Sequence, residues 1–298
     1  RNFCSKIWNA FRLIKGWTVD DNIQAPDAAK LAVHWFESKQ NEVAAEVADL
    51  FSKYRLSEAL MAVYKLFWDE FSSWYLEMIK PAYGQGIDRT TYDATLCFLD
   101  NLLHLLHPFM PFITEELWQQ MYERNAEEGE SLMVSALSMD TYVDTAFVAQ
   151  FEVVKGVISN IRSIRLQKNI AQKEPLDLQV LGENPVAEFN AVIQKMCNLS
   201  SITVVESKVE GASSFMVGTT EYAVPLGNMI DVEAEIARME AELKHKEGFL
   251  QGVLKKLSNE KFVNNAPAAV LEMERKKQAD AESIISSLKE SIAALKKA

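Results

Sequence analysis

A heptad pattern between residues 230 and 298 constrains the fold of this chain most strongly. Apolar residues recur there at alternating intervals of four and three, the spacing with which one helix packs along another in a coiled coil. In the first stripe Lys246 takes one seam position, and the apolar members are Val232, Ile236, Met239, Leu243, Leu250, Val253 and Leu257. In the second stripe Glu274 and Gln278 take seam positions, and the apolar members are Leu271, Ala281, Ile285, Leu288, Ile292 and Leu295.

The segment SNEKFVNNAP, residues 258–267, separates the two stripes. Its paired asparagines favour a break in the helix, and its proline suits the first turn of the next one. The pattern therefore predicts an antiparallel two-helix hairpin. Each helix of about 26 residues would be roughly 40 Å long at 1.5 Å per residue. An arm of that length buries little surface against its own domain, so we expect it to contact another molecule.

The rest of the chain reads as two further parts. Residues 1–144 repeat the apolar spacing of amphipathic helices and contain all six tryptophans, which predicts an up-and-down bundle. We expect its second helix to break near Ser38 and a later helix to have its N-cap at Thr114. Residues 145–229 combine helices with β-branched, strand-like runs. The sequence thus predicts a mainly α protein with a helical bundle (1–144), a small α+β subdomain (145–229) and an antiparallel coiled-coil arm (230–298).

Charge is distributed unevenly along the chain. The net charge of −11 at pH 7 argues against a general attraction to polyanions. Residues 155–173, however, contain five Lys or Arg and no acid, and residues 244–277 contain eight Lys or Arg and four acids. Two local basic surfaces on an acidic protein indicate specific contacts with an anionic partner.

The sequence offers no pattern for catalysis or metal binding. Its glycines are scattered and form no phosphate loop. His104 and His107 lie in a leucine-rich helix without a nearby ligand set, which favours partly buried polar packing over a metal site. Cys4, Cys97 and Cys197 lie far apart, so we expect reduced thiols in a cytoplasmic protein. Since no apolar run approaches eighteen residues, we expect no membrane span.

Several long motifs in the correct order resemble a known family. RNFCSKIWNAFRL, FWDEFSSWYLEMIKP and LLHPFMPFITEELW resemble the anticodon-binding domain of the class I aminoacyl-tRNA synthetases for branched aliphatic amino acids. GASSFMVGTTEYAVPL, IDVEAEIARMEAEL and LSNEKFVNNAPAAVLEMER resemble the C-terminal coiled-coil arm of the valyl-tRNA synthetases. One departure is AVHW where the family often has ADRW, which leaves open whether His34 substitutes for a basic residue.

The resemblance implies a role in binding tRNA. The bundle would engage the anticodon stem and loop of a valine tRNA, and the arm would reach its elbow. The signatures of the ATP-using catalytic domain are missing, and the chain starts at Arg1 within a helical pattern. We therefore expect the C-terminal third of a cytoplasmic valine–tRNA ligase, inactive and without a cofactor of its own. Its partners would be valine tRNA and the enzyme's N-terminal catalytic domain; we expect no membrane contact and a monomer.

The first predicted helix and the loop after it supply candidate contacts with the anticodon region. Lys6, Asn9 and Arg12 recur every three residues and form the polar stripe of that helix. Contact with RNA and ordinary solvation both explain such a stripe. Trp17 follows Gly16 in a loop. Its indole could stack on an unpaired base or pack onto the bundle, and the sequence leaves both interpretations open.

Two basic segments supply candidate phosphate contacts. Arg162 and Arg165 lie one helical turn apart and, with Lys168, could grip consecutive phosphates, because guanidinium forks suit phosphate oxygens. Pairing with acids of the bundle is the alternative. The candidates at the tip of the arm are Lys244, Lys246, Lys255, Lys256, Lys261, Arg275, Lys276 and Lys277.

A protein-interaction scaffold, whose coiled coil dimerises with another chain, is the rival interpretation. The polar seam residues argue against it, and so do Gly248 and Gly252, which each cost about 1 kcal/mol in a helix. A free-standing enzyme is disfavoured because the sequence has no catalytic set.

Overall fold

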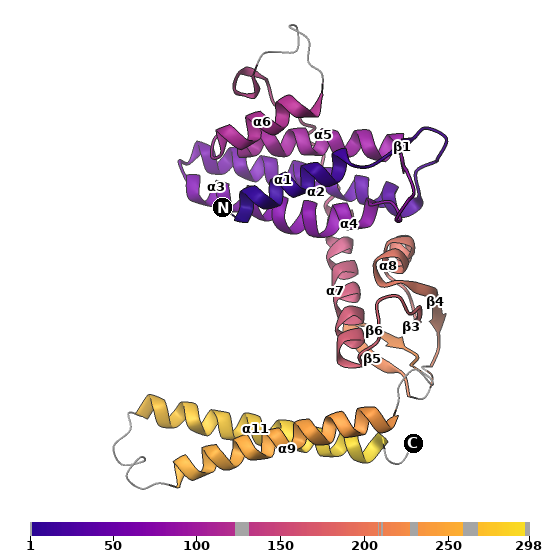
Figure 1. Ribbon diagram of the computed structural model, residues 1–298, viewed down its shortest axis with the longest axis vertical. Coiled ribbons are helices and arrows are strands. Elements are labelled where there is room, and N and C mark those ends of the chain that lie inside the picture. The colour runs from indigo at the N-terminus through magenta and orange to yellow at the C-terminus, as the bar shows by residue number, and fades with distance from the viewer. Residues whose placement is uncertain are drawn as a thin grey trace. The chain divides into compact units, whose positions relative to one another are not determined.

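The computed structural model describes residues 2–122, 131–207, 209, 211–226, 232–258 and 268–295. The protein is mainly helical with small sheets, which agrees with the predicted fold class (Figure 1). Residues 1–225 form one compact unit and residues 226–298 form a second. Each helix in the described ranges is too short or too polar to traverse a lipid bilayer.

The first unit begins with a helical bundle. Its helices are α1 (Asn2–Lys15), α2 (Asp27–Ser52), α3 (Leu56–Lys65), a π-helical stretch (Leu66–Tyr75), α4 (Leu76–Ile79), α5 (Arg89–Leu106) and α6 (Pro111–Met121). Apolar residues at helical spacing explain why these segments pack together: in α1, Ile7, Phe11 and Ile14 share one face and are buried. Aromatic rings fill the centre, where Phe36 lies 5.0 Å from Tyr75 and 5.1 Å from Phe98 between ring centroids.

Two local predictions for the bundle are wrong. Helix α2 runs through Ser38 without a break. The Ser38 side chain is buried, and its hydroxyl accepts a hydrogen bond from the Asp144 N–H at 3.2 Å. Helix α6 begins at Pro111, so Thr114 is not its N-cap. The Thr114 hydroxyl instead donates to the carbonyl of Met110 at 2.9 Å. The hydroxyls of Ser38 and Thr114 thus form hydrogen bonds inside the fold, and the spacing of residues in the sequence does not predict these bonds.

A helix and a four-stranded sheet complete the first unit. The elements are a short 3₁₀ helix (Leu132–Val134), α7 (Thr145–Gln167), β3 (Leu176–Leu181), a second 3₁₀ helix (Ala187–Phe189), α8 (Asn190–Cys197), β4 (Leu199–Val205), β5 (Ser213–Val217) and β6 (Thr220–Val224). The strand order is β4-β3-β6-β5, with β3 parallel to β4 and antiparallel to β6. Strand β5 is antiparallel to β6. The strands and helices expected between residues 145 and 224 are therefore present.

Helix α7 packs against both the bundle and the sheet. On the bundle side, the rings of Phe151 and Trp35 lie 4.1 Å apart between centroids, and Trp35 is fully buried. Lys155 forms an ion pair with Glu70 at 2.6 Å. On the sheet side, a Cβ on Gly156 would lie 3.0 Å from a methyl group of Val217. These contacts join the bundle and the sheet into one compact unit.

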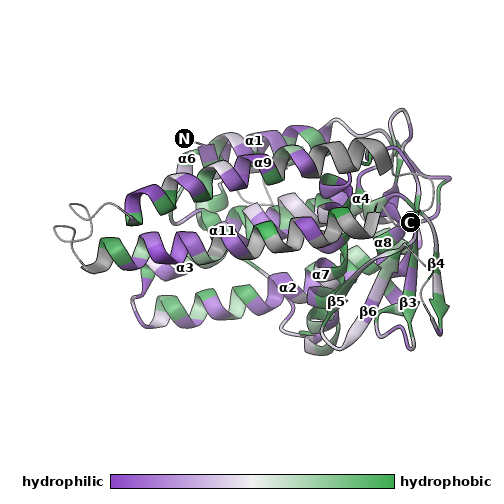
Figure 2. Ribbon diagram, turned by 90° about the horizontal axis from the view of Figure 1, so that it is seen from below, coloured by the Kyte–Doolittle hydropathy of each residue, from purple (hydrophilic) through white to green (hydrophobic). Residues whose placement is uncertain are grey.

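The second unit contains α9 (Val232–Leu257) and α11 (Ala268–Leu295). The two helices lie side by side in both views (Figures 1 and 2), and hydrophobic and hydrophilic residues alternate along their described parts. Among the seam positions with described side chains, the buried ones are Val253, Glu274, Ala281, Ile285 and Ile292. Ion pairs join Lys256 to Glu274 at 3.8 Å and Lys289 to Glu247 at 2.9 Å. The predicted turn at residues 259–267 lies outside the described residues.

Candidate functional site

Two loops of the first unit lie side by side and shape a site. A parallel pair of two-residue strands, β1 (Val19–Asp20) and β2 (Ile87–Asp88), joins them. The Ile87 N–H donates to the carbonyl of Thr18 at 2.9 Å. A Cβ at Gly86 would lie only 3.0 Å from the same carbonyl oxygen, so this close approach requires glycine. Gly84 has a φ of +78°, a conformation that other residues adopt only with strain.

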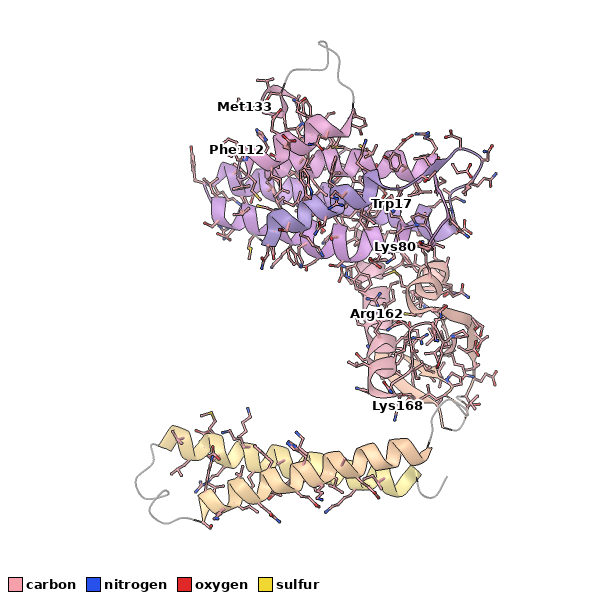
Figure 3. The ribbon with its side chains drawn as sticks, viewed as in Figure 1. Trp17, Lys80, Phe112, Met133, Arg162 and Lys168 are labelled. Atoms are coloured by element: carbon pink, nitrogen blue, oxygen red, sulfur yellow. The ribbon has the colours of Figure 1, made fainter. Side chains whose placement is uncertain are left out.

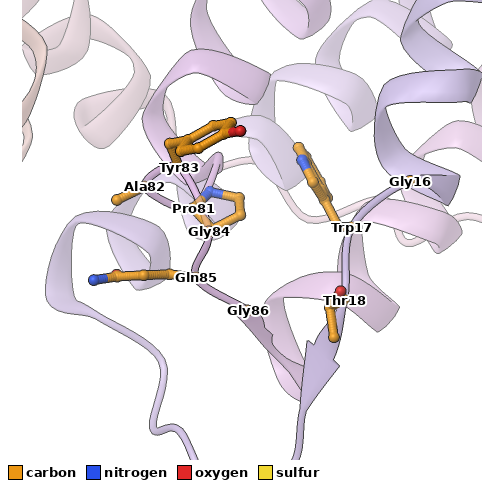
Figure 4. A pocket seen from close by; sticks show the side chains of 9 residues that line it. All are labelled: Gly16, Trp17, Thr18, Pro81, Ala82, Tyr83, Gly84, Gln85 and Gly86. Carbon is orange, nitrogen blue, oxygen red and sulfur yellow. The ribbon is translucent and has the colours of Figure 1, made fainter.

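A pocket of about 430 Å³, which we call the aromatic pocket, lies between these loops. One loop contributes Gly16, Trp17 and Thr18, and the other contributes Pro81, Ala82, Tyr83, Gly84, Gln85 and Gly86. Figure 4 shows one aromatic ring from each loop at the pocket, Trp17 and Tyr83, with the ring of Pro81 beside Tyr83. The Trp17 side chain is half-buried, whereas Tyr83 is fully exposed.

The polar stripe of α1 leads toward this pocket. Asn9 and Arg12 are exposed. Lys6 is half-buried, and its ammonium lies 4.9 Å from the centroid of the Trp68 ring. Helix α1 ends at Lys15, and Gly16 alone separates it from Trp17. All four candidates thus lie on α1 or in the loop directly after it, and none of them is fully buried.

The predicted phosphate grip on α7 is wrong for Arg165. Its side chain is buried, with 1% exposure. One terminal guanidinium nitrogen donates to the carbonyl of Ala171 at 2.9 Å, and the other donates to the carbonyls of Cys197 at 2.7 Å and Asn198 at 3.2 Å. Desolvation lowers the pKa of this guanidinium. Arg165 therefore satisfies carbonyl groups of the loop after α7 and of the end of α8, and its guanidinium does not face a ligand.

The other basic residues of the segment 155–173 have different surroundings. Lys155 forms ion pairs with Glu70 of the bundle and with Glu152 on its own helix. Arg162 is exposed, and its guanidinium lies 5.6 Å from the centroid of the Trp74 ring. Lys168 is half-buried directly after the end of α7 (Figure 3). Of the three candidates on this segment, Arg162 and Lys168 keep access to solvent.

A second pocket, of about 330 Å³, adjoins the first, and we call it the cationic pocket. Its lining consists of Glu77, Lys80, Pro81, Ala82, Arg162, Gln172, Lys195, Met196 and Asn198. Three cations face one acid there, and Lys80 pairs with Glu77. Sequence reasoning missed Lys80, Lys195 and Tyr83. The first two come from elements far apart in the chain, while Tyr83 could have been found as an aromatic residue in a Gly-containing loop after Pro81.

The arm residues are mostly exposed where they are described. Lys244, Lys255, Lys256, Arg275, Lys276 and Lys277 are exposed, Lys246 is half-buried, and Lys261 lies outside the described residues. Glu274 partly neutralises this group, since it accepts a hydrogen bond from Lys277 at 2.8 Å and faces Lys256. The described part of the arm therefore retains several exposed cations.

The histidines and cysteines have structural surroundings. His104 shares hydrogen bonds with the Asp100 carbonyl and the Ser135 hydroxyl, and His107 shares one with Thr114, which confirms their polar packing. His34 lies 3.2 Å from a carboxylate oxygen of Asp144. The three cysteines are free. Across the described ranges, no three or more His, Cys, Asp or Glu residues converge as metal ligands would.

Two family profiles match separate parts of this chain. A family profile described as "Anticodon-binding domain of tRNA ligase" matches residues 33–180, and one described as "Valyl tRNA synthetase tRNA binding arm" matches residues 231–296. The first match begins after α1, so it does not test the residues of that helix.

Several similar curated proteins are named valine–tRNA ligase. Those of Bacteroides thetaiotaomicron, Porphyromonas gingivalis and Enterococcus faecalis are 99%, 53% and 35% identical, with 100%, 98% and 99% of this chain covered. The chain spans about a third of their length, at 34%, 33% and 35% respectively.

Proposed function

The chain belongs to the family of valine–tRNA ligases, and from this we propose that it is the tRNA-binding region of such an enzyme. In this proposal, residues 1–144 bind the anticodon stem and loop, residues 145–229 contact the tRNA backbone, and residues 230–298 reach the elbow. The observation that carries the proposal is the presence of an anticodon-binding domain and a tRNA-binding arm in one chain.

Helix α1 is the proposed contact with the anticodon arm. Arg12 and Asn9 are exposed on it, and Lys6 can leave the Trp68 ring at small cost because cation–π contacts at exposed sites are worth about 0.5–1 kcal/mol. Each cation that neutralises a phosphate releases counterions, so binding should weaken linearly with the logarithm of salt concentration. Trp17 next to this stripe offers a ring for an unpaired base.

An electrophoretic shift with transcribed valine tRNA, repeated with a tRNA of unrelated specificity, tests the proposal. The chain should bind the valine tRNA more tightly. Lys6→Gln and Arg12→Gln should each weaken binding and lower the salt slope by about one. Lys53→Gln is the matched control, since Lys53 is exposed and pairs with Asp49 on its own helix. Equal affinity of the folded α1 variants and the parent would support ordinary solvation of the stripe.

For the arm we propose an antiparallel coiled coil whose exposed cations contact tRNA phosphates. Two ion pairs support this arrangement. Glu247 in the middle of α9 pairs with Lys289 near the end of α11, whereas Lys256 at the end of α9 pairs with Glu274 near the start of α11. The partners thus run in opposite directions along the two helices. Phosphate contacts would add affinity and fix orientation while carrying little sequence information. Lys244, Lys255, Lys276 and the other arm cations named above are the residues proposed for this role.

Attachment of valine to tRNA with ATP is proposed for the whole enzyme, whose N-terminal catalytic domain would be the second partner of this chain. We propose that the chain by itself uses no cofactor and acts in the cytoplasm as a monomer. Valine-dependent ATP–pyrophosphate exchange should stay at background with the purified chain. Exchange above background would contradict this assignment.

The scaffold alternative makes a different prediction about self-association. The seam residues Val253, Glu274 and Ile285 are buried within this chain, where α9 packs on α11. A seam that is already covered within one chain disfavours a dimer built on the same seam. Sedimentation should therefore give one monomer mass across concentrations. A concentration-dependent dimer that disappears on deletion of residues 230–298 would favour the scaffold.

A further inference from the structure

The aromatic pocket and the cationic pocket are neighbours, because Pro81 and Ala82 line both of them. Figure 3 shows Trp17, Lys80 and Arg162 in succession from the bundle to α7. Two aromatic rings, Trp17 and Tyr83, thus lie at one pocket, and three cations, Lys80, Arg162 and Lys195, lie at the other. A nucleotide combines a flat base with an anionic phosphate, so its base matches the aromatic pocket and its phosphate matches the cationic pocket.

We propose that these two pockets together hold one unpaired nucleotide of the bound RNA, with the base in the aromatic pocket and a phosphate in the cationic pocket. The proposal rests on the proposed tRNA binding and adds the residues Tyr83, Lys80 and Lys195 to it.

The aromatic pocket suits a base for three reasons. Tyr83 is fully exposed and Trp17 is half-buried, so both rings keep accessible surface on which a base can stack. A Cβ at Gly84 would meet nothing within 4 Å, so the backbone of the loop is open there and permits close approach of a flat ligand. The loops are also held in place by the β1–β2 pairing, so the site exists before the ligand arrives.

The cationic pocket suits a phosphate. Lys80 and Arg162 are exposed at its lining, and Lys195 donates to the carbonyl of Lys80 at 3.0 Å with one of its three hydrogens. Among the described residues, Arg162 has no acidic partner and is held over the Trp74 ring. Glu77 is the only acid in the lining, so the pocket has a positive balance.

The electrostatics of Lys195 agree with an anionic ligand. Although the residue as a whole is exposed, desolvation of its ammonium lowers its pKa, and the charge of Lys80 lowers it further. A phosphate would relieve this repulsion between the two cations. A carboxylate-rich protein segment could occupy the cationic pocket as well, but it would not use two open aromatic rings beside it.

The test measures binding of transcribed valine tRNA to the full chain over a range of salt concentrations. Tyr83→Ala should raise the Kd about five- to hundredfold, the usual loss for a stacked base, with an unchanged salt slope. Lys195→Gln should raise the Kd and lower the salt slope by about one, and Lys195→Arg should restore the slope. Tyr54→Ala and Lys53→Gln are matched controls, because both residues are exposed on another part of the bundle.

A variant that combines Tyr83→Ala with Lys195→Gln tests whether one nucleotide occupies both pockets. Residues that contact the same nucleotide should show losses that are not additive, whereas independent contacts should add in free energy. Photo-crosslinking with 4-thiouridine-substituted valine tRNA should identify Tyr83 or Trp17 by mass spectrometry.

The results distinguish a failure of this inference from a failure of the proposed tRNA binding. If the parent binds valine tRNA and the α1 variants weaken it, but Tyr83→Ala and Lys195→Gln match their controls, this inference is wrong and the proposed function stands. Additive losses would overturn the sharing of one nucleotide. A parent chain that binds no tRNA would overturn both proposals.

Discussion

Arg165 illustrates how far the identity of a residue can mislead about its role. It lies in an acid-free basic segment, as a phosphate contact would, yet its guanidinium bonds three carbonyls inside the first unit. The spacing of Arg162 and Arg165 predicts a shared helix face, but the contacts of Arg165 with the loop after α7 and with the end of α8 bury it, whereas Arg162 stays exposed. That information comes from residues 171–198 and not from α7 itself.

Replacement of Arg165 by Met should therefore destabilise the protein. The three carbonyl oxygens would lose their donors, and leaving buried acceptors unsatisfied costs about 1–3 kcal/mol of the free energy of unfolding. Urea denaturation measures this loss. Lys173→Met, at an exposed cation of the same segment, should change stability by less than about 0.5 kcal/mol. Equal stability of both variants would show that Arg165 is not a structural residue.

Asp144 should make the stability of the first unit depend on pH. Its carboxylate accepts a hydrogen bond from the Phe147 N–H at 3.0 Å and faces His34, and these contacts in that order lower its pKa. Because the folded pKa lies below the unfolded value of about 3.9, the stabilisation is complete above that pH and disappears as pH falls through the folded pKa. The difference in unfolding free energy between the parent and Asp144→Asn should therefore shrink in acid. A difference that stays constant with pH would contradict this.

At the scale of elements, periodicity predicted most of the structure. The amphipathic spacing predicted in residues 1–144 corresponds to helices such as α1, and the strand-like runs predicted in residues 145–229 correspond to strands such as β3. The β1–β2 pair could not be predicted, since two residues in each strand carry no period and the partners are 68 positions apart in the chain. The aromatic pocket depends on that pair, so its existence was not visible in the sequence.

The seam of α9 and α11 offers a test of helix pairing. Glu274 is buried at a seam position, and one of its carboxylate oxygens has no hydrogen-bond partner among the described residues. Its partners Lys256 and Lys277 are exposed, so loss of the carboxylate leaves no buried cation behind, and a leucine at this position would bury more apolar surface. Glu274→Leu should therefore slow hydrogen exchange of backbone amides in both helices. Glu272→Leu, at an exposed neighbouring position, should not. Faster exchange in Glu274→Leu would show that this position is not a packed seam.

At the scale of the whole molecule, the candidate site depends on distant segments. Lys80 directly follows α4, Arg162 lies on α7 and Lys195 lies on α8, so no spacing within one segment could have joined them. The arm is different, because its basic residues cluster between residues 244 and 277 and were found from the sequence alone. Sequence reasoning therefore identified the local basic segments and missed the site that tertiary structure assembles.

Deletion of the arm should separate tRNA binding from amino-acid chemistry in the whole enzyme. In the valine–tRNA ligase of Bacteroides thetaiotaomicron, removal of the segment equivalent to residues 230–298 should raise the KM for tRNA several-fold, because phosphate contacts are lost. Valine activation without tRNA should stay near the parent rate. A stable truncated enzyme that charges tRNA at the parent KM would show that the arm cations are ordinary solvated residues.

The packing of α7 against the bundle also has a consequence for sequence variation. Glu70 and Lys155 form an ion pair between a bundle helix and α7, and half-buried Lys155 also lies 5.2 Å from the centroid of the Trp35 ring. Loss of either partner would leave the other charge without its counterion at a packed contact. Substitutions at these two positions should therefore occur together among homologues, so that a valine–tRNA ligase without an acid at position 70 also lacks a cation at position 155.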